Sequence, residues 1–237
     1  MDLSFRSAKK ELIDQQGIAF GDIRQNMIEL EIINSRLGGH QITIEGFKKL
    51  VSLPADQKKF LVCEIGCGGG DNLKAIERFN NKKQLDLSFI GIDINPETIR
   101  YAARNCSSLK NICFITADYK AAKFIDQPDI IFSSLFCHHF TNQELIEILK
   151  WNKANARIGF FINDLQRHWL AYKAIKLLSA LFSKSYLLKN DAPVSVLKGF
   201  RKKELKGLLQ KAGINNFTIH WRWAFRWLII VKNNNHS

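Results

Sequence analysis

The sequence predicts a single α/β domain built on a doubly wound, mostly parallel sheet. Strand-like apolar runs alternate with helix-like segments through the middle of the chain, a rhythm typical of parallel strands joined by helical crossovers. The first run, residues 60–65, is apolar on both faces, as a strand buried in a parallel sheet should be. The length of 237 residues suits one such domain with a substantial core.

The N-terminal 57 residues are expected to form a helical cap. Ile23, Met27 and Leu30 recur at helical spacing within residues 21–36, and the pair of glycines at 38–39 ends that helix. A second, shorter helix fits residues 43–52, ahead of Pro54.

Residues 58–165 are expected to form the core. Pro96 occupies the favoured first turn of one helix, and Thr141 with Glu144 makes a capping box at the start of another. The expected elements are strand 60–65, helix 71–80, strand 87–92, a helix after Asn95-Pro96, strand 112–116, strand 129–135, helix 141–152 and strand 157–162.

Residues 166–237 are expected to form lid helices and a C-terminal hairpin. Residues 167–184 predict an amphipathic helix with one apolar face, and residues 201–212 predict another helix that ends at Gly213. Two strands fit the end of the chain, at 216–221 and 225–231.

Charge is unevenly distributed along the chain. Residues 1–148 hold 18 Lys/Arg and 19 Asp/Glu, whereas residues 149–237 hold 17 Lys/Arg and three Asp/Glu, a net charge of +14. This asymmetry indicates an anionic partner for the C-terminal third, such as nucleic acid, an acidic membrane surface or an acidic substrate, or else solubilising charge on helices. The polar N-terminus and the absence of an apolar run of roughly 18 residues predict a cytoplasmic protein.

The glycine cluster after the first strand predicts a nucleotide-like ligand. Gly66, Gly68 and Gly70 let the chain turn sharply and let a ligand approach bare backbone. Acids follow at the ends of the next two strands, Asp93 and Asp118, where they can accept hydrogen bonds from a ribose and from an adenine amine. The phosphate-binding lysine of a Gly-Lys-Ser/Thr loop is absent. The expected ligand is therefore an adenosine without phosphates.

These motifs together resemble those of the class I S-adenosylmethionine-dependent methyltransferases. The matching segments are Glu64-Ile65-Gly66-Cys67-Gly68-Gly69-Gly70, Gly91-Ile92-Asp93-Ile94-Asn95-Pro96, Thr116-Ala117-Asp118-Tyr119 and the run from Ser133 to Phe140. The resemblance implies a Rossmann-like, seven-stranded sheet with an antiparallel last strand and S-adenosylmethionine as the cofactor. It implies cofactor-binding roles for Glu64, Gly66, Cys67, Gly68, Gly70, Asp93, Ile94, Asp118, Tyr119 and Leu135.

A narrower likeness extends beyond the core. The segments from Arg6 to Asp14, Asn34 to His40, Asn163 to His168 and Asp191 to Val196 are similar to bacterial methyltransferases of the quinone-biosynthesis type, whose relatives accompany phenolic-lipid and polyketide pathways. It implies a small, hydrophobic phenolic, quinone-like or polyketide-type acceptor, methylated on oxygen or carbon. The helix at 167–184 would cover the acceptor pocket or rest on an anionic bilayer.

Three residues are candidates for acid–base chemistry. His138 and His139 follow the fourth core strand, and Asp164 ends the fifth. A histidine there could take a proton from a hydroxyl near neutral pH; the alternative is a histidine that caps the next helix. No metal is expected, because the five cysteines form no Cys-x-x-Cys pair. No covalent cysteine is expected either, because the sulfonium of the implied cofactor is already a strong electrophile.

Two other functions remain open at this point. The basic C-terminal third, with Trp221, Trp223 and Trp227, would also suit an RNA methyltransferase, although the segment after the fourth strand lacks the paired prolines of base amino-methyltransferases. The third interpretation is a protein that binds the cofactor or a partner without turnover. The sequence does not predict an oligomeric state.

Overall fold

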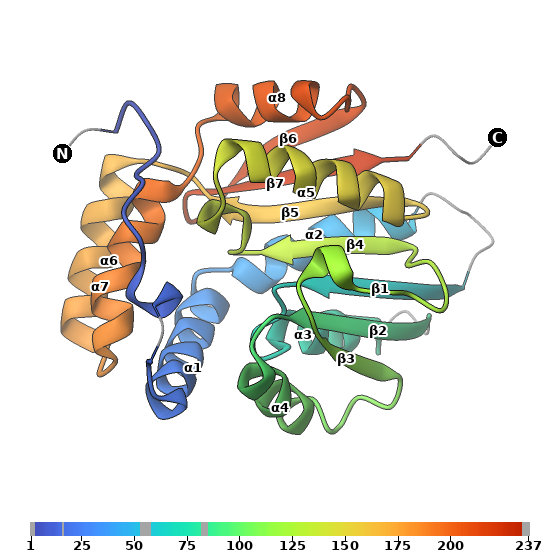
Figure 1. Cartoon of the computed structure of the whole chain (residues 1–237), viewed down its shortest axis with the longest axis horizontal. Coiled ribbons are helices and arrows are strands. Elements are labelled where there is room, and N and C mark those ends of the chain that lie inside the picture. Colours follow the sequence, from blue (N-terminus) through green and yellow to red (C-terminus); the bar gives the residue numbers. More distant parts are fainter. Residues whose placement is uncertain (1–2, 16, 53–57, 82–84, 234–237) are drawn as a thin grey trace.

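A seven-stranded sheet forms the centre of the part of the chain that the computed structural model describes, residues 3–15, 17–52, 58–81 and 85–233 (Figure 1). The strand order is β3-β2-β1-β4-β5-β7-β6, and every pairing is parallel except those of β7 with β5 and β6. The strands are β1 (Lys59–Ile65), β2 (Asp86–Asp93), β3 (Ile112–Thr116), β4 (Ile130–Ser134), β5 (Gly159–Leu165), β6 (Phe217–Arg222) and β7 (Arg226–Lys232). The predicted fold class is confirmed, including the antiparallel last strand.

Helices cover both faces of the sheet, and the side chains of β1 are accordingly buried on both faces. Phe60 and Val62 pack into the core beneath α2 (Gly39–Val51) and α3 (Asp71–Asn80). Cys63 and Ile65 point the other way, toward α5 (Asn142–Asn155) and α8 (Lys202–Lys211). Because successive strand residues alternate between faces, a strand covered on both sides must be apolar throughout.

The remaining large elements gather at the carboxyl ends of the parallel strands (Figure 1). They are the N-terminal segment with its short 3-10 helix η1 (Leu12–Asp14), α1 (Phe20–Arg36), α6 (Trp169–Phe182) and α7 (Tyr186–Lys198). α4 (Pro96–Asn105) follows β2, and Asn95 caps it by accepting hydrogen bonds from the N–H groups of Glu97 and Thr98.

Several element boundaries differ from the prediction, and one helix was not predicted. α2 begins at Gly39, four residues earlier than expected, because Gly38 takes a left-handed φ of 78° and joins α1 to α2 without a linker. β5 runs from 159 to 165 rather than from 157 to 162. α7 was not predicted; it contains Pro193, which lacks the N–H of a regular helical hydrogen bond and usually interrupts a helix.

Candidate active site

The loop after β1 turns through glycines in conformations that other residues disfavour. Gly66, Gly68 and Gly70 have φ values of 66°, 51° and 76°, in the left-handed region that glycine alone adopts without strain. A Cβ atom at Gly66 would lie 2.2 Å from the ring of Phe136, whereas one at Gly68 would meet nothing within 4 Å. The loop therefore presents bare backbone to open space.

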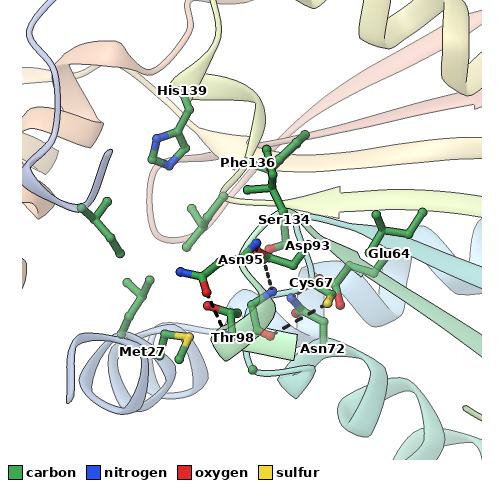
Figure 2. A pocket seen from close by; sticks show the side chains of 18 of the residues that line it. Met27, Glu64, Cys67, Asn72, Asp93, Asn95, Thr98, Ser134, Phe136 and His139 are labelled. Carbon is green, nitrogen blue, oxygen red and sulfur yellow. Dashed lines mark hydrogen bonds between the residues drawn. The ribbon is translucent and has the colours of Figure 1, made fainter. Parts of the chain in front are cut away.

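That open space is a cavity of about 590 Å³ at the carboxyl ends of β1, β2 and β4. It lies where the strand order reverses between β1 and β4, the usual ligand position in open α/β sheets. Of the ten residues that the family resemblance implies for the cofactor, nine line this cavity (Figure 2). Gly70 does not; a Cβ atom there would lie 2.5 Å from the Cys106 sulfur, so its role is to allow close packing.

Asp93, at the end of β2, is held in place by backbone donors. Its Oδ2 accepts a hydrogen bond from the N–H of Gly68 at 3.2 Å, and its Oδ1 accepts one from the N–H of Asn95 at 3.0 Å. Burial raises the pKa of this carboxyl group, against the effect of these hydrogen bonds. A carboxylate has about four acceptor positions, so each oxygen can accept a second hydrogen bond from a ligand hydroxyl.

Glu64, near the end of β1, is buried with half of its hydrogen-bonding capacity unused. Asn72 donates to its Oε1 at 2.8 Å, while its Oε2 has no hydrogen-bond partner among the described residues. Burial raises the pKa of Glu64 well above its usual range. A buried acceptor without a partner is costly, and a ligand ammonium group would both satisfy Oε2 and stabilise the charged form.

Asp118 and Tyr119 follow β3 and form another wall. Asp118 accepts a hydrogen bond from the N–H of Lys120 and so caps the 3-10 helix η2 (Tyr119–Ala121). The Tyr119 ring is buried and makes edge contacts with Trp151 and Phe136, with ring centroids 5.3 Å and 6.5 Å apart. Its position beside Asp118 provides an apolar surface on which a flat base can lie.

Three further predicted residues complete this part of the wall. Ile94 is 71% exposed, so it lies at the rim of the cavity. Leu135 has a φ of 53°, a strained conformation for a residue with a side chain, which turns the chain sharply after β4. Burial raises the pKa of the Cys67 thiol well above its usual range, so this sulfur is not a thiolate near neutral pH.

The two adjacent histidines lie in different surroundings. His138 is buried in the 3-10 helix η3 (Cys137–His139) and its Nδ1 lies 2.7 Å from Oδ1 of Asp164. Burial opposes the charge of Asp164, but its ion pair and hydrogen bond with His138 prevail and lower the pKa of Asp164. Neither His138 nor Asp164 lines the cavity, whereas His139 does.

His139 meets carboxylates that come from the N-terminal segment. Its Nδ1 lies 3.3 Å from Oδ1 of Asp14 and 3.9 Å from Oε1 of Glu11. Burial acts to lower the pKa of His139, but the hydrogen bond to Asp14 and the two nearby negative charges outweigh it, so the pKa is raised. Nζ of Lys198, 3.1 Å from the same Glu11 oxygen, supplies a fixed positive charge within this cluster.

The N-terminal segment and α1 close the cavity from outside the core. Their lining residues are Ile13, Asp14, Ile23, Asn26, Met27, Leu30, Glu31 and Asn34. In Figure 2, His139 and Met27 lie on one side of the cavity and Glu64 and Cys67 on the other. No lining residue comes from α6, so the expectation that residues 167–184 cover the pocket is wrong: η1 and α1 do so.

Hydrogen bonds to the core and to α7 hold the N-terminal segment in place. Arg6 donates to the backbone carbonyl oxygens of His138, Phe140 and Lys198 at 2.8–2.9 Å. Asp191 accepts hydrogen bonds from the N–H groups of Leu12 and Ile13. The sequence predicted a helical cap in this region but did not identify the residues of η1 and α1 that line the cavity; the apolar face of helix 21–36 was the signal that could have indicated them.

Comparison with known proteins agrees with this geometry. Residues 62–159 match the family model of a methyltransferase domain, and no curated protein matches the chain by sequence. Among solved structures, the plantazolicin methyltransferase BpumL in complex with S-adenosylhomocysteine (SAH) is 17% identical with a TM-score of 0.62, over 90% of this chain and 96% of that one.

Two other similar structures were also determined with the cofactor. Human N-acetylserotonin methyltransferase in complex with S-adenosylmethionine (SAM) is 16% identical with a TM-score of 0.63; the alignment covers 90% of this chain and 56% of the human one. Magnesium protoporphyrin IX methyltransferase from Synechocystis PCC 6803, with bound SAM, is 13% identical with a TM-score of 0.58, over 91% of each chain. At such identities these structures show a shared fold.

The cavity fits the cofactor of this family on its own evidence. The unpartnered Glu64 oxygen suits an ammonium group, the bare backbone at Gly68 suits close approach, and the Asp93 carboxylate suits paired hydroxyls. Residues 62–159 therefore match a methyltransferase domain, and the sheet around them has the fold of the class I S-adenosylmethionine-dependent methyltransferases.

Proposed function

We propose that this enzyme methylates a small, apolar acceptor of the phenolic, quinone-like or polyketide type on oxygen or carbon, with His139 as the general base. The observation that carries the proposal is the position of His139 in the cavity wall, with Asp14 on its Nδ1. The plantazolicin, N-acetylserotonin and magnesium protoporphyrin IX methyltransferases are named for small-molecule acceptors, which supports the same class here.

The cofactor would be held by the wall of the cavity that lies opposite His139. Asp93 would accept hydrogen bonds from the ribose hydroxyls, Glu64 would pair with the ammonium group, and the backbone at 66–69 would lie against the amino-acid part. Asp118 and Tyr119 would border the adenine. When bound, SAM supplies an electrophilic methyl group on a sulfonium, so the protein mainly positions the reactants.

Of the three predicted acid–base residues, His139 is the one that lines the cavity, which supports its role as the base. The carboxylates of Asp14 and Glu11 favour a proton on Nδ1, which leaves Nε2 to accept a proton from an acceptor hydroxyl. His138 packs against the His139 ring, with ring centroids 4.4 Å apart, and is itself held by Asp164. We assign His138 and Asp164 to positioning His139.

The walls near His139 support an apolar acceptor. Ile13, Ile23, Met27, Leu30 and Phe140 line the cavity there, and the ionisable groups they accompany are Asp14 and Glu31. An apolar lining with few polar groups binds a hydrophobic ligand and orients it through those groups. An acceptor of this kind partitions into bilayers, so we also propose that the enzyme is cytoplasmic and makes peripheral contact with the membrane.

Transfer of a tritiated methyl group from SAM tests the proposal. The acceptor panel contains simple phenols, quinols, long-chain phenols and total RNA. We expect transfer to a phenol or quinol, and a loss of about 10²–10⁴-fold in kcat/KM for His139→Gln, the usual contribution of a general base. The affinity of this variant for SAH should stay unchanged, and His220→Gln, on β6, serves as the matched control.

Two results would contradict the proposal. If only RNA accepts methyl groups, the acceptor class is wrong. If His139→Gln transfers methyl groups to a hydroxyl acceptor as fast as the unaltered enzyme, the base is another group.

A further inference from the structure

α6 has its large apolar side chains on the outside. Its buried residues are Ala171 and Ser179, both small. Leu177, Leu181 and Phe182 are 61%, 65% and 78% exposed. A helix that only packs on a core shows the opposite arrangement, with its large apolar residues turned inward. A gathering of exposed apolar side chains of this kind marks a contact with something outside the described chain.

Aromatic rings continue this face beyond the helix. The ring of His168 lies 6.0 Å from that of Trp169 and stacks on Phe225 at 4.9 Å. Phe225 lies in the turn between β6 and β7, with its ring 6.4 Å from that of Trp221 and 6.3 Å from that of Trp223. The result is one surface, here called the α6 surface, made of Trp169, Leu170, Leu177, Leu181, Phe182, Trp221 and Trp223, all exposed.

The charged residues of the segment that contains α6 are all basic. Residues 165–190 contain no Asp or Glu, and four exposed lysines lie there: Lys173, Lys176, Lys184 and Lys189. From α1, Glu29 reaches the end of α6, but its carboxylate accepts hydrogen bonds from the backbone N–H groups of Lys184 and Ser185.

The acidic residues of the C-terminal third all bind other groups of the protein. Asp164 binds His138, Asp191 binds the backbone of η1, and Glu204 binds Arg167. These are the three acids among residues 149–237. The α6 surface therefore combines exposed apolar groups with lysines and has no acid of its own to neutralise them.

We propose that the α6 surface docks on an anionic phospholipid bilayer. Leucine and phenylalanine side chains enter the acyl region, tryptophans favour the interface, and lysines meet anionic headgroups. Near such a surface each lysine strengthens binding on the order of fivefold. RNA phosphates would match the lysines but leave the leucines in water. A symmetric contact with a second copy would bring the lysines of both copies together with no acid opposite them.

The position of α6 connects the bilayer with the cavity. α7 contacts α6, and it also contacts η1 and α1, which line the cavity. Throughout the described ranges no helix has the length and apolarity needed to span a bilayer, so the contact would be peripheral. The biological role of this docking rests on the proposed function, in which an apolar acceptor would enter from the bilayer. The test of docking itself does not depend on enzyme activity.

Sedimentation with vesicles tests the docking. One vesicle type is phosphatidylcholine alone, and the other contains about one third phosphatidylglycerol. We expect binding to the anionic vesicles only, weakened at least tenfold by the double change Leu177→Gln with Leu181→Gln and to a similar degree by Lys173→Gln with Lys176→Gln. The matched control is Ile32→Gln with Ile125→Gln, which changes exposed apolar side chains elsewhere and should bind normally.

Each alternative gives its own result. Equal sedimentation of the leucine double variant, or equal binding to both vesicle types, overturns the proposal. A dimer in gel filtration that the leucine changes dissociate assigns the surface to a second copy instead, and salt-sensitive RNA binding without vesicle binding assigns it to RNA. The leucine variant should still methylate a water-soluble phenol normally; failure of all small acceptors with intact vesicle binding would refute the proposed function and leave the docking standing.

Discussion

Replacing Asp93 with asparagine should weaken cofactor binding strongly while leaving the fold intact. In the structure each Asp93 oxygen already accepts one backbone N–H group, at 3.2 Å and 3.0 Å, and retains one free acceptor position. Two ligand hydroxyls can therefore donate to a charged acceptor, and each such bond contributes about 1.5–3 kcal/mol. Asparagine keeps the shape but has one acceptor oxygen and no charge.

The expected loss follows from these numbers. One ligand hydrogen bond disappears and the other becomes a weaker neutral one, so binding should lose about 2–3 kcal/mol, or about 30- to 150-fold in Kd. Asparagine is preferable to alanine because it keeps one acceptor oxygen for the N–H groups of Gly68 and Asn95, whereas alanine would leave both of them without an acceptor.

Isothermal titration with SAH measures this effect directly. The matched control is Asp86→Asn, at the exposed opposite end of the same strand, where no change in Kd is expected. Thermal unfolding without ligand shows whether Asp93→Asn is folded. A folded Asp93→Asn protein whose Kd for SAH stays within twofold of the unaltered protein would refute the assignment of Asp93 and, with it, the orientation of the cofactor in the cavity.

Three other changes test separate parts of the structure. Asp14→Asn removes a negative charge that raises the pKa of His139. Since the base must be neutral to accept a proton, the rise of kcat/KM with pH should move to lower pH, and an unmoved profile would argue against the pair. Gly66→Ala places a Cβ atom 2.2 Å from the ring of Phe136, at a backbone φ of 66°, and should therefore lower both the unfolding temperature and the affinity for SAH. Gly207→Ala is the control: its Cβ atom would meet open space, so neither quantity should fall. Phe161→Ala, fully buried beneath α2, should cost about 3–5 kcal/mol in the free energy of unfolding measured with urea, and a cost below about 1 kcal/mol would contradict the packing described.

The core was predictable because its signals are local. The glycines after β1 and the acids at the ends of β2 and β3 lie beside the elements they belong to, and strand alternation then brings them to one edge of the sheet. The capping box of Thr141 and Glu144 is local in the same way, and the structure contains it. Such features need no knowledge of distant contacts.

The histidine pair shows where local signals end. His138 and His139 are consecutive in a single 3-10 turn, so the sequence alone cannot say which one faces the cavity. The choice is made by Asp164, 26 residues away, which binds His138 from within the core. The same holds for α6: its apolar face was predicted, but its outward orientation depends on how the helix packs on α7.

The two halves of the cavity therefore depend on different kinds of contact, one local in the sequence and the other between distant segments. The half proposed for the cofactor is made by backbone turns and acids of the core, whereas the half proposed for the acceptor is closed by η1 and α1, which lie outside the core. The buried charges of Glu11 and Lys198 pair with each other, and leaving either one buried without the other would be strongly unfavourable. The same contacts that hold the N-terminal segment closed also bring Glu11 and Asp14 to His139. Closure of the proposed acceptor half and the raised pKa of His139 thus depend on one set of contacts.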